Sequence, residues 1–447
     1  MTAIGRRAFL AGSSGLFAAL AAPAAEGEGK KPAVEEKAAE GKLIASAPML
    51  QNAAETSMGV AWAVSANANG FVDVSESPDM SGARRVKCGG YRVTGMNDKV
   101  MQVRLTGLKP ATRYYYRIGA DRIEYKGGYS MKRMGTEIDE KVRSFATLGA
   151  AAEAHFCVIN DTHERSASMN LVFDKVSELG PSCVVWNGDA CNVQETVDSL
   201  VSVFLNPKVR RKDYAAETPY LFCPGNHDQR GLAARRLEDV VMFRQPEERS
   251  SRDWDLGRNF AVRLGDIALV GLDTGEDRSD DNAFGAGLFN NGPYREAQTE
   301  WLRDALRRPD IASAPFLVAF CHIPLYSQKW NGAPIPGKAD HQAWRCRCGE
   351  IWGPLLDEAG CQLVIAGHTH KYSYTKAVPG HSWSQLVGGS PSLGSRFDHA
   401  LRKTVPDEGC FPTVIDGRVA GGALEVTVHD LYHKTVAGRF TYEPRKR

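Results

Sequence analysis

Five short stretches of the sequence each place Asp, Asn or His directly after an apolar run. The polar residues of these stretches are Asp161 and His163 in FCVINDTHE, Asp189 in VVWNGDACN, Asn226, His227 and Asp228 in LFCPGNHD, His322 in LVAFCHIP, and His368 and His370 in LVIAGHTH. Apolar runs of this length are typical of buried strands, and open α/β folds place ligands at the carboxyl ends of such strands. Carboxylate, amide oxygen and imidazole together suit borderline-hard cations such as Mn, Fe and Zn. The five stretches together predict a metal site, although any one of these histidines alone would be typical of a structural residue.

The stretch Val184–Asn192 is central to this interpretation. Its apolar run stops at Gly188-Asp189, and Gly188 permits a tight turn at the strand end. Asp189 is then presented at the carboxyl edge of the sheet, where its two oxygens can bridge two cations. A Gly-Asp pair alone would indicate only a turn. The four other strand-then-ligand stretches are what favour a bridging ligand.

Taken in order, DTH, NGD, GNHD, CHIP and GHTH resemble the motifs of the calcineurin-like metallophosphoesterases. The resemblance covers the chain from about Ala152 to the C-terminus, and it implies a two-metal site in a four-layer α/β/β/α sandwich. It assigns seven ligands by motif: Asp161, His163 and His370 for the first metal, Asn226, His322 and His368 for the second, and Asp189 between them. His227 would lie beside the substrate phosphate. Asp228 could orient His227 or serve as a structural carboxylate in the turn.

This constellation implies hydrolysis of a small-molecule phosphate ester with two divalent or trivalent metal ions (Mn, Fe or Zn) as cofactors. Two cations about 3.5–4 Å apart clamp a phosphoryl oxygen and lower the pKa of a bound water, and the resulting hydroxide attacks phosphorus in line. His227 would stabilise the developing charge or protonate the leaving group. The sequence has neither a G-x-S-x-G motif nor a Walker P-loop to support serine-hydrolase or nucleotide-motor chemistry.

The elements that must position these ligands follow from the pattern after Ala152. Strand patterns alternate there with helical ones, which predicts βαβ units and a largely parallel sheet. The expected helices are Asn170–Leu179, Val193–Phe204, Gln298–Leu306 and Trp352–Ala359. After GHTH the chain becomes β-like, with Leu424, Val426 and Val428 alternating against polar neighbours. The region 152–447 is long enough to bury one large core.

The preceding region, Leu43–Leu148, reads as all-β. Its expected strands are Met58–Val64, Phe71–Ser75, Val100–Leu105, Arg113–Ile118 and Arg143–Leu148. Short strands between Gly, Pro and Asn residues favour a β-sandwich. LTGLKPATRYYYRIG and SFATL resemble the fibronectin-III-like N-terminal domain of purple acid phosphatases. The Tyr114–Tyr116 cluster could be a carbohydrate platform, but a role in the core is favoured. The region contains no histidine, so we expect it to supply no metal ligand.

Two of the metal motifs depart from those of purple acid phosphatases. Those enzymes have D-x-G where this chain has Asp161-Thr162-His163. They have G-D-x-x-Y, with the tyrosine on iron, where this chain ends in Asn192. Tyrosinate bound to ferric iron gives them their colour, and Asn192 cannot donate a phenolate. We therefore predict that this protein is not purple and that Mn, Zn or Fe(II) are plausible occupants.

The N-terminus, Met1–Ala25, is predicted to be a targeting segment. Arg6-Arg7 followed by Ala8-Phe9-Leu10 resembles a twin-arginine export signal, so we expect export to the periplasm or the extracellular space. The apolar run Phe17–Ala22 is too short to span a membrane, and no transmembrane segment is expected elsewhere. Glu26–Lys42 is predicted to be a solvated tether because it is rich in charged and small residues.

Charge and cysteine content narrow the alternatives further. A net charge of +2 over 447 residues gives no electrostatic footprint for nucleic acid or a membrane surface. Of the ten cysteines, four are expected to be buried thiols in the strands that lead to the site: Cys157, Cys183, Cys223 and Cys321. Cys191 could be exposed. Cys346-x-Cys348 is a poor zinc spacing. Disulfides remain open for an exported protein.

Two loops are candidates for the rim of the site. Asp273–Asn291 is polar and rich in Gly and Asp, which predicts a solvated loop near the site mouth. Tyr326–Lys338 follows His322 closely and contains Trp330 and two prolines, so it is a candidate for substrate selection.

Three functions are compatible with the sequence. The first is an exported phosphomonoesterase, which the front domain favours. The second is a phosphodiesterase acting on nucleotides or phospholipid headgroups, and the third is a binding protein with an inert hydrolase domain. The complete ligand set argues against the third. The sequence leaves the natural substrate and the oligomeric state open.

Overall fold

The structure is a computed structural model that describes residues 41–89, 95–243, 254, 256–326, 341–377, 380–398 and 400–446, with only the course of the backbone for 341–346. The predicted export signal, Met1–Ala25, and nearly all of the predicted tether lie outside these residues. The candidate selection loop Tyr326–Lys338 does so too, apart from Tyr326. Tyr326 stacks on Trp383, with ring centroids 4.1 Å apart.

The front of the described chain is an all-β sandwich, as the sequence predicts. One sheet holds β3 (Ala68–Ser75), β4 (Arg84–Lys87), β5 (Met96–Asn97), β7 (Arg113–Tyr125), β8 (Met131–Ile138) and β9 (Arg143–Ala146). The facing strands are β1 (Met49–Gln51), β2 (Met58–Ala63) and β6 (Val100–Leu105). Tyr114 and Tyr116 are buried in the core, where Tyr114 stacks on Phe145, so the core interpretation of the tyrosine cluster is confirmed.

The two parts of the chain share a sheet, which the sequence did not lead us to expect. β1 pairs in parallel with β12 (Tyr220–Cys223), with Gln51 opposite Tyr220. The strands β1, β2 and β6 therefore extend a nine-stranded sheet in the order β23-β22-β21-β10-β11-β12-β1-β2-β6. The buried Tyr116 hydroxyl donates a hydrogen bond of 2.6 Å to the carbonyl of Ala216. Main-chain and side-chain bonds thus join the front sandwich to the α/β region.

The α/β region is a four-layer sandwich, as predicted. Its share of the first sheet comprises β10 (His155–Ile159), β11 (Cys183–Asn187), β12, β21 (Thr413–Ala420), β22 (Ala423–Asp430) and β23 (Thr435–Tyr442). The second sheet comprises β13 (Phe260–Leu264), β14 (Ile267–Leu272), β15 (Phe316–Cys321), β16 (Leu363–Ala366), β17 (Ser373–Thr375) and β18 (Ser384–Val387). The inner faces of both sheets form one apolar core around residues such as Phe156, Val185 and Phe320. A separate hairpin pairs β19 (Ser395–Asp398) with β20 (Lys403–Pro406).

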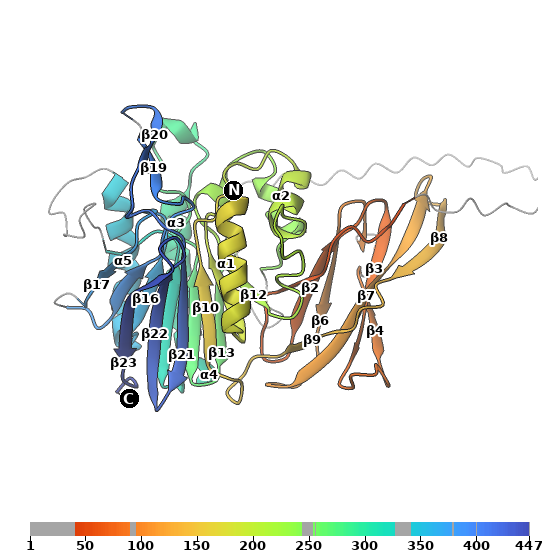
Figure 1. Ribbon diagram of the computed structural model, residues 1–447, viewed down its shortest axis with the longest axis horizontal. Coiled ribbons are helices and arrows are strands. Elements are labelled where there is room, and N and C mark those ends of the chain that lie inside the picture. Colours follow the sequence, from red (N-terminus) through yellow and green to blue (C-terminus); the bar gives the residue numbers. More distant parts are fainter. Residues whose placement is uncertain are drawn as a thin grey trace, which may run out of the picture. The chain divides into compact units, whose positions relative to one another are not determined.

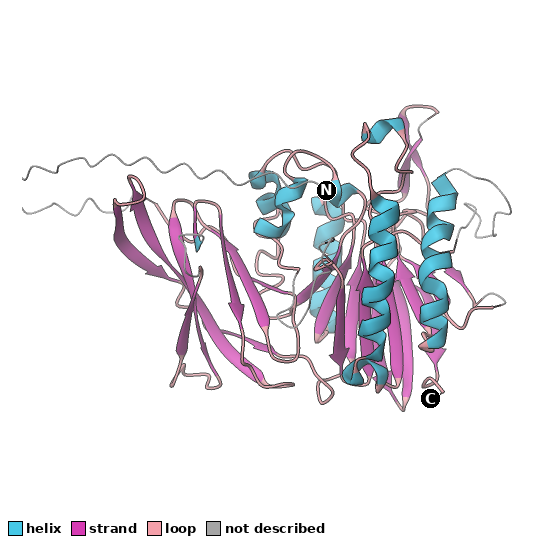
Figure 2. Cartoon of the chain, turned by 180° about the vertical axis from the view of Figure 1, so that it is seen from behind, coloured by secondary structure: helices cyan, strands magenta, loops and turns pink. Residues whose placement is uncertain are grey.

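Helices cover the two outer faces. α1 (Ser166–Leu179) and α2 (Val197–Phe204) pack on the first sheet, and α1 is seen in front of it in Figure 1. α3 (Asn291–Arg307) and α5 (His341–Glu358) pack on the second sheet and face the viewer in Figure 2. The short elements are α4 (Pro309–Ala312), η2 (His227–Gln229), η3 (Ala234–Asp239) and η4 (Ala283–Gly285). α2 begins after the predicted Val193 because Thr196 and Ser199 form a capping box there.

The prediction of a largely parallel sheet holds only for the strands that lead to the candidate ligands. β10, β11 and β12 are parallel, as are β14, β15, β16 and β18. The outer strands β13, β17, β21, β22 and β23 are antiparallel. The difference arises because tight turns join β13 to β14 and β21 through β23, and parallel neighbours would need crossover helices.

The cysteine predictions are confirmed except at one position. Cys157, Cys183, Cys223 and Cys321 are buried thiols, and all nine cysteines among the described residues are free. Cys191 is also fully buried, so its predicted exposure is wrong. Its side chain packs in the apolar cluster that includes residues of α1 and α2. No helix within the described ranges is long and apolar enough to cross a membrane.

Candidate metal centre

The predicted ligands converge where strands of the two sheets end. Asp161 follows β10, Asp189 follows β11 and Asn226 follows β12, while His322 and His368 follow β15 and β16 of the second sheet. The side chains of Asp161, Asp189 and His322 are almost completely buried. The two sheets therefore bring together residues that are up to 209 positions apart in the sequence, from Asp161 to His370.

Three glycines of the motifs have no side chain and so leave space for the side chains of the candidate ligands. A Cβ atom at Gly188 would lie 2.3 Å from the ring of His322, and one at Gly225 would lie 2.2 Å from Asp189 Oδ1. At Gly367 it would lie 2.5 Å from Asp161 Oδ2. Any larger residue at these positions would displace a ligand.

The backbone of the site is strained. Five of the predicted ligands have left-handed backbone conformations, with φ angles of 49° at Asp161, 43° at His163, 49° at Asp189, 70° at His368 and 57° at His370. Such conformations cost about 1–3 kcal/mol each for residues other than glycine and are found mainly at functional sites. The left-handed residue His368 directs its main-chain N–H inward, where it donates to Asp161 Oδ2 at 2.9 Å. His227 N also donates inward, to Asp189 Oδ1 at 2.9 Å.

The first group of converging atoms comes from Asp161, His163, Asp189 and His370, whose ligand atoms all lie within 4.8 Å of one another. His163 Nε2 is 2.9 Å from His370 Nε2 and 3.4 Å from Asp189 Oδ2. His370 Nε2 is 3.3 Å from Asp161 Oδ1. This is the set that the resemblance assigns to the first metal, together with the bridging carboxylate.

The second group comes from Asp189, His322 and His368, again with ligand atoms within 4.8 Å of one another. His322 Nε2 is 3.1 Å from Asp189 Oδ2. Asn226 is brought to the same place, since its Oδ1 is 3.0 Å from His368 Nδ1. Asp189 thus belongs to both groups, as a bridging ligand must.

The donor set fits a pair of metal ions. His322 Nδ1 lies 2.9 Å from the carbonyl of Asn187, which places its single neutral-state proton there and leaves the Nε2 lone pair facing Asp189. Nε2 is buried and makes no hydrogen bond with any residue that the structure describes. Burial alone would lower the pKa of His322, but Asp189 and Asp161 more than offset it and raise the pKa to about 10. A nitrogen and a carboxylate that face each other in this way require a cation, and a metal ion supplies one.

Asn192 holds His163 in place, a role that the sequence did not suggest. The Asn192 amide oxygen lies 2.9 Å from His163 Nδ1, and its amide nitrogen donates to the carbonyl of His163 at 3.0 Å. His163 Nε2 is thereby left free of its proton and directed at the site. Burial also lowers the pKa of His163 to about 4, so the imidazole is neutral.

Asp228 lies among main-chain N–H groups. It accepts hydrogen bonds from Asp189 N at 2.9 Å, Gly225 N at 2.8 Å and Cys191 N at 3.0 Å. These contacts tie two ligand loops together. They favour the structural alternative for Asp228 over a role in orienting His227, whose Nδ1 instead lies 3.1 Å from the carbonyl of Asn192.

Arg230 and Glu276 are part of the site, and sequence reasoning missed both. Arg230 Nη1 lies 3.0 Å from His227 Nε2, and the same guanidinium binds Glu276 through Nε at 3.0 Å and Nη2 at 2.6 Å. Glu276 is almost fully buried. Burial would raise the pKa of Glu276, but the hydrogen bonds and charge of Arg230 bring it down to about 2. Glu276 thereby fixes the Arg230 guanidinium against His227.

The expectation of a solvated loop over Asp273–Asn291 is wrong for its first residues and confirmed for residues 281–290, most of which are exposed. Asp273, Thr274 and Glu276 are buried, because the guanidinium of Arg295 donates to the carbonyls of Thr274 and Glu276 at 2.8 and 2.6 Å. The position near the site holds: Asp277 Oδ2 is 3.8 Å from His368 Nε2. No motif in the sequence marks Arg230, which stands two positions after GNHD.

Asn187 joins the two sheets directly behind the centre. Its buried side-chain amide, at the end of β11, donates to the carbonyls of Cys321 and Ile365 in the opposite sheet at 3.2 and 3.0 Å. Its own carbonyl is the partner of His322. A single residue therefore sets both the spacing of the sheets and the orientation of one candidate ligand.

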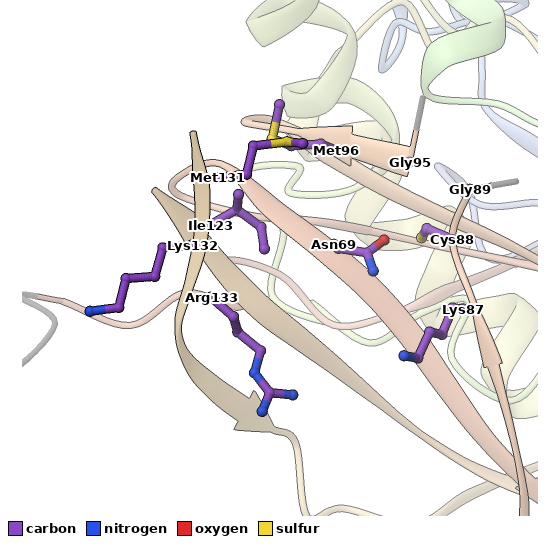
Figure 3. A pocket seen from close by; sticks show the side chains of 10 residues that line it. All are labelled: Asn69, Lys87, Cys88, Gly89, Gly95, Met96, Ile123, Met131, Lys132 and Arg133. Atoms are coloured by element: carbon purple, nitrogen blue, oxygen red, sulfur yellow. The ribbon is translucent and has the colours of Figure 1, made fainter. Parts of the chain in front are cut away.

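A hollow of about 490 Å³ lies elsewhere, in the front sandwich. Figure 3 shows the residues that line it, which are Asn69, Lys87, Cys88, Gly89, Gly95, Met96, Ile123, Met131, Lys132 and Arg133. None of them is a predicted site residue. We place the functional site at the ligand cluster because it combines buried charge, convergent donors and strained backbone, whereas the hollow is a mixed apolar and basic surface.

The fold and the cluster of His and Asp residues define a metal-dependent phosphoesterase, and comparison with known proteins agrees. Residues 154–372 match the family described as calcineurin-like phosphoesterase, and residues 47–133 match the N-terminal domain of purple acid phosphatases. The chain is a calcineurin-like metallophosphoesterase with a purple acid phosphatase N-terminal domain.

Curated relatives are distant. Purple acid phosphatase 18 of Arabidopsis thaliana is 26% identical over 168 residues, which cover 37% of this chain and 32% of the relative. Acid phosphatase type 7 of Mus musculus is 22% identical over 302 residues, or 65% of this chain and 59% of the relative. The chain thus spans between about a third and three fifths of the length of the relatives it matches.

Solved structures share the fold at low identity. The purple acid phosphatase PPD1 from yellow lupin (Lupinus luteus) superposes with a TM-score of 0.59 at 14% identity, covering 88% of this chain and 73% of that one. PhoD superposes with a TM-score of 0.59 at 12% identity, covering 91% and 92%. The likeness extends over both the front sandwich and the α/β region.

We predict that Arg230→Lys lowers kcat/KM by about tenfold to a hundredfold while metal content stays unchanged. Lysine keeps the charge but cannot bind Glu276 with two parallel hydrogen bonds and also reach His227. The measurement is steady-state turnover of a chromogenic phosphate ester alongside metal analysis. Arg236→Lys is the matched control, since Arg236 forms an ion pair with Asp239 on an exposed face. Equal turnover of the two variants would remove Arg230 from the site.

Proposed function

We propose that this chain hydrolyses phosphate monoesters with two metal ions held by Asp161, His163 and His370, by Asn226, His322 and His368, and by Asp189 between them. The observation that carries the proposal is the convergence of three imidazole Nε2 atoms, those of His163, His322 and His370, on two buried carboxylates. The similarity to purple acid phosphatases favours monoesters over diesters.

Metal ions, when bound, supply Lewis-acid polarisation of a phosphoryl oxygen and a water of lowered pKa. The protein's own groups would hold the metal ions and bind the phosphate group. Asp161 and Asp189 provide fixed negative charge, and the backbone N–H groups of His227 and His368 fix the carboxylate oxygens. His227 and Arg230 lie side by side at the edge of the cluster, and the Arg230 guanidinium supplies positive charge and N–H donors for phosphate oxygens.

The proposal is tested by turnover of 4-nitrophenyl phosphate and bis(4-nitrophenyl) phosphate in parallel, on the full chain and on Asp189→Ala. We expect preferential turnover of the monoester. Loss of the bridging carboxylate should cost about 4 kcal/mol of transition-state stabilisation, roughly a thousandfold in rate. Asp174→Ala is the matched control, because Asp174 is a half-exposed carboxylate that pairs with Arg210.

The outcomes of this assay separate the candidate functions. Preference for the diester would favour the phosphodiesterase alternative, and absence of turnover with both metals bound would favour a binding protein with an inert domain. Near-wild-type turnover of Asp189→Ala with full metal content would show that the ligand assignment is wrong.

We further propose that neither metal carries a tyrosinate ligand and that the metals are Mn, Zn or Fe(II). The support is Asn192, which stands where purple enzymes have the tyrosine and whose amide is committed to His163. We expect the concentrated, metal-loaded protein to lack a strong phenolate-to-iron band in its visible spectrum. Such a band, lost on mutation of a tyrosine, would contradict the first-metal assignment.

Export through a twin-arginine signal is a separate proposal that rests on Arg6-Arg7 and the apolar residues after them. Because the signal is read by a receptor, both arginines should be required. Cells producing an Arg6→Lys, Arg7→Lys variant should retain the protein in the cytoplasm on fractionation. Unchanged accumulation outside the cytoplasm would point to a general secretory signal instead.

A further inference from the structure

A second group of metal-ligating side chains lies toward the other end of β10. His155 and Cys157 are on this strand, and Asp416 is directly opposite Cys157 on β21. The neighbouring strand β22 contributes His429, opposite Val414 of β21. The three strands are adjacent in the sheet order, and Figure 1 shows β21 and β22 beside β10. Cys157 faces α1, so the group lies between the first sheet and this helix.

The donor atoms of this group are already close together. The ligand atoms of His155, Cys157 and Asp416 lie within 4.8 Å of one another. His155 is 4% exposed, Cys157 is 0% exposed and Asp416 is 5% exposed, so water does not solvate them. His155 Nε2 lies 2.7 Å from Asp416 Oδ1. These residues come from strands, which hold side chains more firmly than loops do.

His429 supplies an independent sign that a cation belongs here. Its Nε2 atom is buried and makes no hydrogen bond among the described residues. The nearest carboxylate oxygen, Asp416 Oδ2, is 4.0 Å away, which is beyond hydrogen-bonding distance. A buried imidazole nitrogen without a hydrogen bond is costly. A metal ion beside Asp416 would satisfy it with a small rotation of the ring.

We propose that His155, Cys157, Asp416 and His429 form a structural metal site of the zinc type, separate from the dinuclear centre. Imidazole, thiolate and carboxylate are all zinc ligands, and the four groups together suffice for the four-coordinate geometry of a structural zinc site. Arg418 donates to Asp416 Oδ2 at 2.7 Å, so the carboxylate is oriented from outside and keeps Oδ1 for the metal. Binding replaces the His155–Asp416 hydrogen bond, so the proton on His155 Nε2 moves to Nδ1 or, if the ring is charged, leaves to solvent, and the Cys157 thiol proton is released to solvent as well.

Such a site would fasten the C-terminal strands to the strand that carries Asp161. His155 and Asp416 are separated by 261 positions, so the metal would close a very long loop of the chain. Its role is structural because all four ligands come from the protein and no open position is left for a substrate.

Cobalt(II) distinguishes this site from the dinuclear centre. Of the ligand types in the two sites, only a thiolate gives Co(II) a strong charge-transfer band in the near ultraviolet. None of the seven predicted ligands of the dinuclear centre is a thiol. Metal-free full-length protein is titrated with Co(II). We expect a third equivalent that develops with this band. Cys157→Ser should lose the band and that one equivalent while turnover of 4-nitrophenyl phosphate is retained.

The matched control is Cys361→Ser, which should keep the band. The Cys361 thiol is equally buried, but its hydrogen bonds go to the carbonyls of Leu317 and Leu363. His429→Ala, at a side chain that is 18% exposed, should weaken binding of the third equivalent if Cys157→Ser does not fold.

Absence of the near-ultraviolet band from the wild-type protein would overturn the proposal, as would a band that persists in Cys157→Ser. An inactive protein that binds a single equivalent of Co(II) and shows the near-ultraviolet band would support this site and count against the dinuclear centre. The failures of the two proposals are therefore distinguishable.

Discussion

The structure of the site follows from the burial of two carboxylates, Asp161 and Asp189, at the ends of neighbouring strands. Both are removed from water, and two like charges in such a space repel strongly. Only positive charge between them can offset this cost. Three imidazoles are directed at the pair, and His322 reaches it from the opposite sheet. This arrangement of carboxylates and imidazoles is therefore suited to metal binding.

The ligand loops form one interlocked unit. Asp228 accepts hydrogen bonds from main-chain N–H groups in the loops after β11 and β12. Asp161 accepts a hydrogen bond from the main-chain N–H group of His368, in the loop after β16. Asn187 fixes the distance between the sheets behind them. The loops after β10, β11 and β16 are locally strained, and the strain persists because their neighbours over-determine their conformations. A change in one loop should therefore be felt at ligands in the others.

The places of the candidate ligand stretches could be predicted from the sequence because each stretch follows its own strand within a few residues. The sequence predicted poorly whatever depends on distant pairing. The three-residue strand β1 gives little signal by itself, and its pairing with β12 joins positions 51 and 220. The partners Arg230 and Glu276 are 46 positions apart, and neither lies in a motif. The position of Cys191 beside Asp189 allowed an exposed thiol, but Cys191 packs in the apolar cluster that includes residues of α1 and α2.

The contacts of His227 decide which role it can play. Its Nδ1 lies on the carbonyl of Asn192, so in the neutral ring Nε2 has no proton and accepts from Arg230. Burial lowers the pKa of His227, and the charge of Arg230 acts in the same direction. A neutral ring in this tautomer cannot donate a proton from Nε2 to a leaving group. Arg230, held by Glu276, is then the permanent cation of the pair, and stabilisation of developing negative charge is the role that this geometry favours.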